Sequence, residues 1–256
     1  MLDVESQGKV LRVTMNRPEV RNAFNAELIS QLRAVFSHVD DDIRAIVLSG
    51  RGPAFCSGGD LEWMRSAAKA SPEENERDAL LLAELFQSIT QCHAVVIAMV
   101  QGACFGGGCG LVAAADIAIA ATDAQFAFSE VRLGLVPATI SPFVLPKIGA
   151  GHARHLFTTG EVFTGDHAAR IGLVHDAVPY AELDIAVDRR LKLLLSGGVL
   201  AVKTAKTLAS SPPLGLAEAA QLLATVRSRD EAQEGISAFL DKRKAYFVEK
   251  LEPRNA

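Results

Sequence analysis

The sequence lacks any apolar run long enough to cross a membrane. Its longest such run, residues 94–100, is far shorter than the roughly 20 residues that a spanning helix needs. Asp3 and Glu5 interrupt the first residues, and no apolar stretch follows them, so a secretory signal is not expected. We therefore expect a cytoplasmic protein with no membrane partner.

Cysteine is sparse and lacks the close spacing of metal and redox sites. No two cysteines form a CxxC pair, and all lie in apolar or glycine-rich surroundings. Scattered histidines likewise suggest no metal site. Reduced, buried thiols are expected in place of a disulfide or metal set, at Cys56, Cys92, Cys104 and Cys109.

The sequence also lacks a strong charge of either sign. The formal net charge of -4 gives no reason to expect nucleic acid or an anionic membrane as a partner. Hydrophobic residues make up 49% and charged residues 22%, which is ordinary for a globular protein and argues against disorder. Internal repeats and low-complexity segments are missing as well.

What the sequence does contain is a series of short apolar segments, each typical of a strand. A helix is predicted over residues 26–39, because Asn25 can cap it and its apolar residues fall on one stripe. Strands that are apolar on both sides need cover on both faces of a sheet, which indicates an α/β fold. The predicted strands are residues 9–15, 45–48, 94–100 and 116–121.

The last third of the chain is almost entirely helix-forming. Residues 216–244 carry apolar positions at helical spacing and predict an amphipathic helix or helix pair. We therefore divide the chain into a core domain, residues 1–195, and a helical region, residues 196–256. A helical tail of this kind serves as a lid or as an oligomerisation surface.

Two glycine-bearing loops could carry chemistry. Residues 54–61 and 101–110 each follow a predicted strand and precede a helix. Glycine lets backbone N–H groups face a cleft, and a helix start favours negative charge there. Two such N–H groups, from Gly59 and Gly107, would form an oxyanion hole for a thioester enolate. Close backbone packing at the strand ends is an equally good explanation for either loop alone.

A single carboxylate, Glu130, lies in an apolar segment, residues 128–137. Such a glutamate is often a salt-bridge partner, but beside two oxyanion-hole loops it becomes the candidate general acid/base, with a raised pKa. Asp60 and Asp116 are expected to cap a helix or lie at a strand edge. Arg132 could bind a distal carboxylate, although a surface ion pair is the simpler expectation.

The chain resembles the enoyl-CoA hydratase/isomerase, or crotonase, superfamily. The resemblance rests on AFCSGGDLEWM at residues 54–64, QGACFGGGCGLVAAAD at 101–116, NRPEVRNAF at 16–24 and EGISAFLDKRKAYF at 234–247. It implies an α/β spiral of ββα units with a C-terminal helical trimerisation region. It also implies an acyl-CoA thioester as substrate, no separate cofactor or metal, and a trimer or a dimer of trimers.

The resemblance further implies which residues form the site. The N–H groups of Gly59 and Gly107 would hold the thioester oxygen, and Glu130 would move protons. Coenzyme A would contact the following residues, of which the last two belong to the tail: Val20, Arg21, Ala23, Ser57, Asp60, Leu61, Phe239 and Lys242.

One position departs from the family pattern. Family hydratases commonly carry a second glutamate where this chain has Gly110. A lone Glu130 could hydrate a 2-enoyl-CoA, or move a double bond as an isomerase does, and a non-catalytic acyl-CoA-binding protein is a further alternative. We expect Gly110→Glu to restore the two-glutamate arrangement.

A finer resemblance favours the hydratase. LEWM at residues 61–64, FGGGCGL at 105–111 and SEVRLGLVPATISP at 129–142 are similar to bacterial methylglutaconyl-CoA hydratases. This implies a hydro-lyase that gives a 3-hydroxyacyl-CoA, in fatty acid metabolism or leucine degradation, with 3-methylglutaconyl-CoA or a related branched ester as substrate.

Overall fold

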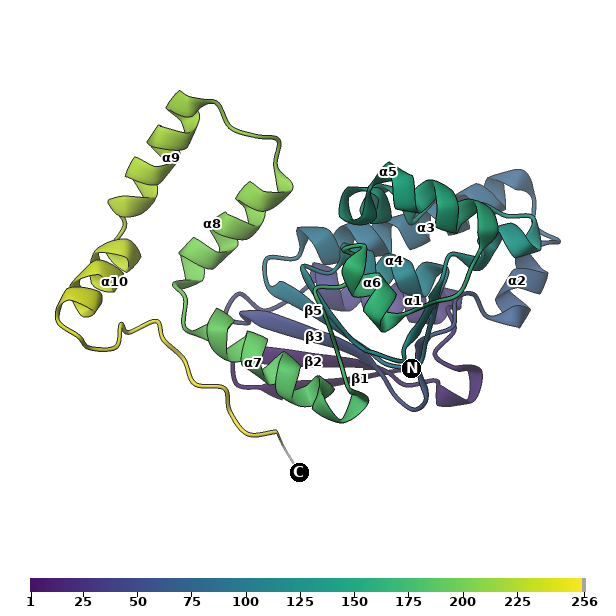
Figure 1. Cartoon of the computed structure of the whole chain (residues 1–256), viewed down its shortest axis with the longest axis horizontal. Helices are drawn as coiled ribbons and strands as arrows, with labels where there is room; N and C mark the ends of the chain where they lie inside the picture. Colours follow the sequence, from purple (N-terminus) through teal and green to yellow (C-terminus); the bar gives the residue numbers. More distant parts are fainter. Residues whose placement is uncertain (255–256) are drawn as a thin grey trace.

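The computed structural model describes residues 1–254, and its core is built on two sheets (Figure 1). All neighbouring strands of the larger sheet are parallel except β1 and β2, which form an antiparallel hairpin. In spatial order that sheet contains β1 (Leu2–Gln7), β2 (Val10–Met15), β3 (Ala45–Gly50), β5 (Val95–Val100), β7 (Ile117–Ala121) and β10 (Asp176–Val178). The smaller sheet contains β4 (Ala54–Cys56), β6 (Ala103–Phe105), β8 (Gln125–Ala127) and β9 (Phe163–Thr164).

Helices cover and extend these sheets. In chain order they are α1 (Ala26–Ser37), α2 (Leu61–Ala67), α3 (Pro72–Gln91), α4 (Gly107–Ala114), α5 (Ser141–Thr159), α6 (Gly165–Arg170), α7 (Leu183–Leu195), α8 (Val199–Ser210), α9 (Leu216–Arg227) and α10 (Asp230–Leu240). Short 3-10 helices occur at Pro18–Val20, Ser129–Leu133 and Tyr180–Glu182.

The chain forms a spiral in which each turn adds one strand to each sheet and then a helix. Strands β3, β5 and β7 enter the larger sheet side by side, and β4, β6 and β8 follow each of them into the smaller one. Because every strand pair in both series is parallel, all turns deliver their helices at the same end of the strands. The predicted spiral of ββα units is confirmed.

Local sequence accounts for most of these elements. Every residue of β3 is buried, as the continuous apolar run required. The Asn25 side chain accepts from Leu28 N at 2.8 Å and starts α1 as predicted. Ser71 and Glu74 form a capping box at the start of α3. The four predicted strands are confirmed as β2, β3, β5 and β7, whereas β1, β4, β6, β8, β9 and β10 are additional. The polar, exposed face of β1 gave no apolar run.

Helices α8, α9 and α10 project away from the two sheets (Figure 1). Arg44, almost fully buried, ties this region to the core by donating to the carbonyls of Leu195 and Phe247, at 3.0 and 2.9 Å, and to those of Leu194 and Gly197. Helix α7 ends at Leu195, the last residue of the predicted core domain. The division into two domains stays a prediction.

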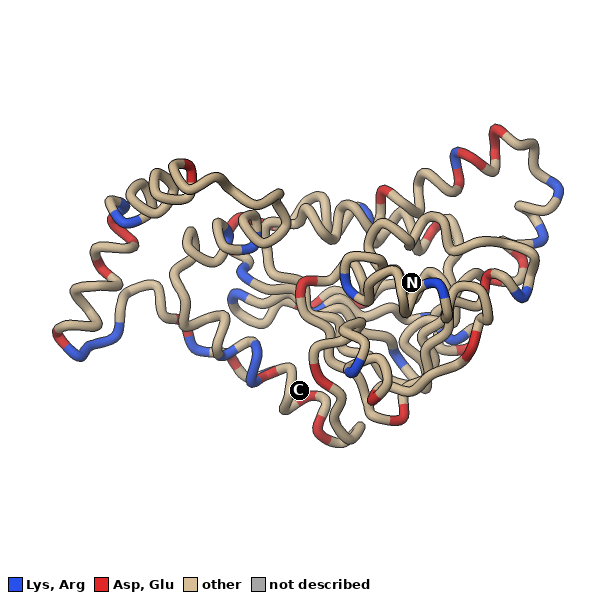
Figure 2. The backbone as a smooth tube through the Cα atoms, turned by 45° about the horizontal axis from the view of Figure 1, so that its top comes forward, with Lys and Arg blue, Asp and Glu red and all other residues tan. Residues whose placement is uncertain are grey.

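Charges of both signs are scattered over the molecule, including its C-terminal helices, without a large region of one sign (Figure 2). Among residues 1–254, no helix is long and apolar enough to cross a membrane.

Candidate active site

The first glycine loop leaves β4 and enters α2. Phe24 N donates to Gly58 O at 2.7 Å, and Asp60 N donates to Phe24 O at 2.8 Å, so Gly59 lies in a short parallel bridge with Phe24. Gly58 has a φ of +96°, a conformation that side chains disfavour. The Asp60 side chain accepts from Glu62 N at 2.9 Å and caps α2, as expected for that residue.

The second loop leaves β6 and enters α4 directly. Gly106 has a φ of +51° and precedes Gly107, the first residue of the helix. A Cβ on Gly107 would lie 2.8 Å from the Phe24 ring, so only glycine fits without movement. The loop therefore needs glycine for space as well as for backbone conformation.

These two loops are in contact with each other. A Cβ on Gly108 would lie 2.6 Å from Cys56 O, and a Cβ on Gly58 would lie 3.3 Å from Phe105 O. Close backbone packing, the alternative explanation, is thus real at Gly58 and Gly108. Packing alone does not account for the adjacent Gly59 and Gly107, because their backbone N–H groups have no acceptor within the described part of the chain.

Within residues 1–254, neither the Gly59 N–H nor the Gly107 N–H has a hydrogen-bond acceptor. Gly107 is the first residue of α4, where an N–H group has no partner inside the helix. Since Phe24 contacts both glycines, the two free donors lie in one small region of the protein. Such a pair of donors suits an oxyanion.

The carboxylate of Glu130 lies beside the second loop. Glu130 belongs to the 3-10 turn after β8, and its Oε1 would be 3.4 Å from a Cβ on Gly106. Its Oε2 is buried and has no hydrogen-bond partner among the described residues. Burial raises the pKa of Glu130, and its own backbone N–H opposes that shift. An unpaired carboxyl with a raised pKa is suited to accept and return a proton.

A cleft of about 710 Å³ opens next to Gly59. Its size suits a small-molecule ligand. Predicted coenzyme A contacts in the core domain all line it: Val20, Arg21, Ala23, Ser57, Asp60 and Leu61. Arg17, Glu19, Glu62 and Met64 line it too, and all four lie in the segments that carry the family resemblance, whereas sequence reasoning missed Arg65. Arg65 could have been found from its position one helical turn after Leu61.

An ion pair joins two walls of this cleft. Arg17 Nη2 lies 2.9 Å from Asp60 Oδ2, and Arg17 also donates to Ala23 O. The backbone N–H of Glu62 and the Arg17 guanidinium together lower the pKa of Asp60. Asp60 is therefore held in its ionised form. It caps α2 and, through Arg17, stabilises the turn that precedes α1.

The predicted tail contacts lie elsewhere in the chain. Phe239 belongs to α10, and Lys242 follows it with a φ of +53°. Helix α10 lies at the opposite end of the molecule from α2 (Figure 1). Neither residue lines the cleft beside Gly59. Their contact with coenzyme A therefore stays a prediction, and within one chain the cleft is formed without them.

Gly110 is enclosed by apolar side chains. A Cβ there would lie 2.6 Å from Phe86 Cζ and 2.6 Å from Ile140 Cγ2. Both side chains are fully buried. The expectation that Gly110→Glu restores a second carboxylate stays a prediction, and it requires the Phe86 and Ile140 side chains to move. Arg132 donates to Gly160 O at 3.1 Å in place of the expected surface ion pair.

The cysteines are free and buried as expected. Cys109 Sγ donates to Cys104 O at 3.0 Å, and burial raises the pKa of Cys56 to about 12. Protonated thiols thus pack behind the glycine loops. In the part of the chain that the structure describes, no three His, Cys, Asp or Glu side chains are placed to hold a metal ion.

Comparison with known proteins agrees with this geometry. The sequence profile described as Enoyl-CoA hydratase/isomerase matches residues 5–250. A Rhodobacter capsulatus protein assigned as an enoyl-CoA hydratase is 34% identical over 92% of this chain and 93% of its own length. The crotonyl-CoA hydratase of Syntrophomonas wolfei is 32% identical over 96% of this chain and 97% of its own.

A solved structure shows the same fold. The Legionella pneumophila protein assigned as an enoyl-CoA hydratase/isomerase (crotonase) is 42% identical, with a TM-score of 0.91 over 96% of this chain and 98% of its own. The prediction of a crotonase fold and of a hydratase-type enzyme is confirmed at the level of the family. The chain belongs to the enoyl-CoA hydratase/isomerase family.

Proposed function

We propose that this protein is an enoyl-CoA hydratase, a hydro-lyase that adds water to a 2-enoyl-CoA and yields the 3-hydroxyacyl-CoA. The observation that carries the proposal is the unpaired Glu130 carboxylate beside two free N–H groups. The hydratase names of the relatives support the same reaction.

In the proposed mechanism the thioester oxygen accepts hydrogen bonds from Gly59 and Gly107. Glu130 takes a proton from water as the oxygen of that water bonds to C3 of the substrate. The C2=C3 electrons move onto the thioester carbonyl, and the two N–H groups stabilise the resulting enolate. Glu130 then returns its proton to C2, so one carboxylate performs both transfers. No separate cofactor takes part, since coenzyme A belongs to the substrate.

The cleft supports coenzyme A as the carrier of the acyl group. Arg21 and Arg65 line it and could meet the phosphates of coenzyme A. We propose a branched 2-enoyl group, with 3-methylglutaconyl-CoA as the first candidate, on the resemblance alone. Arg132 is bound to Gly160 and offers no support for a distal carboxylate there.

An assay with Glu130→Gln tests this function. We expect the wild type to consume a conjugated enoyl-CoA, and the variant to lose about two or more orders of magnitude in turnover, because glutamine cannot move a proton. Binding of the CoA ester should persist. The panel should contain straight-chain, branched and dicarboxylic 2-enoyl esters, with a 3-enoyl ester as the control for isomerisation.

Two results would contradict the proposal. Migration of the 3-enoyl double bond without any hydration would make the protein an isomerase. Equal turnover by the wild type and Glu130→Gln would remove Glu130 from the mechanism.

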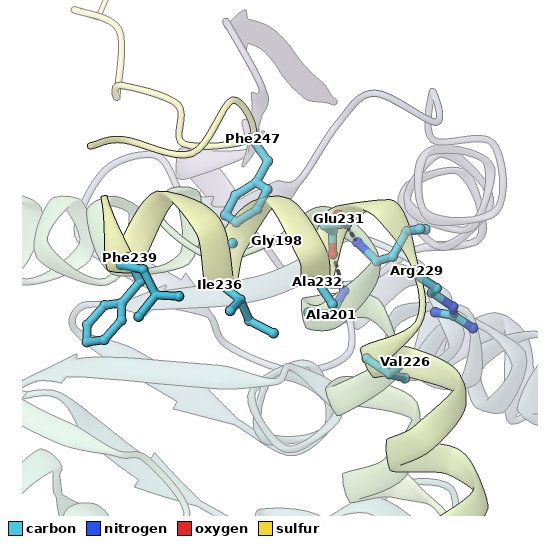
Figure 3. Close-up of a pocket in the computed structure, with 12 residues that line it drawn as sticks. Gly198, Ala201, Val226, Arg229, Glu231, Ala232, Ile236, Phe239 and Phe247 are labelled. Carbon is cyan, nitrogen blue, oxygen red and sulfur yellow. Dashed lines mark hydrogen bonds between the residues drawn. The ribbon is translucent and has the colours of Figure 1, made fainter. Parts of the chain in front are cut away.

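We also propose that the protein assembles as a trimer, or a dimer of trimers, through its C-terminal helices. An apolar groove of about 320 Å³ lies among α8, α9 and α10, with Ile236 and Phe239 projecting from one side of α10 (Figure 3). Glu231 caps α8 by accepting from Leu200 N and Ala201 N, at 2.9 Å each. A neighbouring copy would bring Phe239 and Lys242 to the coenzyme A cleft.

A further inference from the structure

Lys147 lies at the far end of the helix that presents Gly107. It belongs to α5, and its Nζ donates to Ala115 O at 2.8 Å and to Val112 O at 3.5 Å. Both carbonyls belong to the C-terminal end of α4, where carbonyls lack partners within a helix. An ammonium group from another helix therefore supplies the cap that α4 does not have.

Helix α4 has no charged residue of its own in its first or last turn. It has 8 residues, of which all but Gly107 are buried. Water therefore screens the dipole of α4 poorly. Its positive end lies at Gly107, and its negative end lies at Ala115, next to the ammonium group of Lys147. At about 1.5 Å per residue, the two ends are ~12 Å apart.

Other charged groups surround Lys147. Asp116 attracts it electrostatically, but Asp116 is itself paired with Lys206 of α8 at 2.7 Å and accepts from Val96 N at 2.7 Å. His175 faces the same cluster and accepts from Ala118 N at 3.0 Å. Burial and the charge of Lys147 lower the pKa of His175, which keeps the ring neutral at pH 7. When Lys147 is charged, the ion pair of Asp116 with Lys206 cancels and His175 is neutral, so these four side chains carry one net positive charge.

We propose that Lys147 is a positioning residue for the reaction: its ammonium group caps α4 and, along the helix, strengthens the hydrogen bond from Gly107 N–H to the thioester enolate. This inference rests on the oxyanion hole of the proposed function. The charge lies ~3 Å beyond one end of α4 and the oxyanion ~3 Å beyond the other, so the two are ~18 Å apart. At an effective dielectric constant near 20, a unit charge at that distance changes the rate by about fivefold.

The charge of Lys147 can be switched by pH. Burial lowers the pKa of Lys147 to about 8, and Asp116 opposes the shift. Lys147 is therefore charged below about pH 8 and neutral above it. Burial raises the pKa of both Asp116 and Glu130, and Lys147→Met keeps both carboxyls, so a difference between that variant and the wild type reports on Lys147. Cys92, at the end of α3, has its thiol pKa raised by burial and stays neutral.

The pH dependence of kcat/KM tests the inference. We expect kcat/KM of the wild type to fall about fivefold to a lower plateau as pH rises through about 8. In Lys147→Met, kcat/KM should stay at the lower plateau value at every pH above the range in which acid reduces activity. Its kcat should be reduced, and its KM should change little. Lys147→Arg should keep the high activity to higher pH, because guanidinium stays charged. Lys203→Met, on exposed α8, is the matched control and should behave as the wild type.

A second readout separates this inference from the hydratase assignment. A bound 3-oxoacyl-CoA can ionise to an enolate that absorbs in the near ultraviolet, and no water is added. We expect Lys147→Met to raise the apparent pKa of the bound ester by about 0.7 units, equivalent to the same fivefold change. Wild-type pH titration of this signal needs no variant and remains available if Lys147→Met does not fold.

The outcomes are distinct. An enolate shift without any hydration of enoyl esters would reject the hydratase and keep the inference. Hydration with the same pH profile in the wild type and Lys147→Met would reject the inference alone. Failure of the wild type to stabilise the enolate would reject the oxyanion hole and, with it, the inference.

Discussion

At the scale of single residues, two features define the site: the unpaired carboxyl of Glu130 and the filled space next to Gly110. Glu130 Oε2 has no partner among the described residues, although an unpaired buried carboxyl costs stability. Gly110, one helical turn after Gly106, is closed off by Phe86 and Ile140. The single-carboxylate arrangement is therefore built into the packing, and a second glutamate would require the core to move.

Gly110→Ala tests this packing. A methyl group 2.6 Å from Phe86 and Ile140 overpacks the core, for which we expect a loss of about 1–3 kcal/mol in unfolding free energy. The melting temperature should fall by about 2–4 °C for each kcal/mol, measured by thermal denaturation. Gly151→Ala in α5 is the matched control, because no atom lies within 4 Å of its Cβ. That variant should be neutral or gain up to about 1 kcal/mol, since alanine favours a helix. Equal stability of both variants would contradict the packing argument.

At the scale of elements, the cleft depends on a turn and a short helix that have little core of their own. Helix α2 has no buried residue, and Asp60 is its cap. Arg17 joins that cap to the turn before α1 through both Asp60 and Ala23. The position of α2 over the cleft therefore relies on polar contacts more than on apolar burial.

Arg17→Met should affect binding more than chemistry. Loss of the Asp60 contact frees α2 and the preceding turn, so we expect KM for a CoA thioester to rise about tenfold, with a smaller change in kcat. Arg51→Met is the matched control. Its ion pair with Asp3 is also short, at 2.7 Å, but the arginine side chain is 57% exposed and outside the cleft. Exposed ion pairs of this kind contribute little to stability, so the KM of Arg51→Met should equal that of the wild type. Steady-state kinetics of both variants decide the matter, and a normal KM in Arg17→Met would refute the role of the pair.

Sequence patterns predicted these elements where local chemistry determines them. Asn25 and the apolar stripe after it specify α1, and the continuous apolar run at residues 45–48 specifies β3. Patterns could not place β1, whose polar side chains hide its pairing with β2. The filled space at Gly110 was also unpredictable, because Phe86 reaches it from a different helix. Lys147 was missed for the same reason, since its contact to α4 joins residues far apart in the chain.

At the scale of the whole molecule, helix α2, which lines the cleft, and the C-terminal helices lie at opposite ends of one chain (Figure 1). Large apolar side chains remain exposed on that far end, including Leu216 at 93%, Phe239 at 83% and Leu240 at 71%. Large exposed apolar side chains are typical of surfaces that bind another molecule, which supports the proposed assembly through these helices. A second copy is the partner that would also bring Phe239 near a coenzyme A cleft.

Phe239→Asp tests this assembly. A carboxylate at the centre of an apolar interface loses its hydration without gaining a partner, so we expect a smaller species than the wild type at micromolar concentration. Light scattering after size exclusion measures the mass, and KM for the CoA thioester should rise in parallel, because the neighbouring copy no longer reaches the cleft. Val4→Asp, on the edge strand β1 and 48% exposed, is the matched control and should keep both the mass and the KM of the wild type. A monomeric wild type, or an unchanged mass in Phe239→Asp, would show that α10 does not hold the copies together.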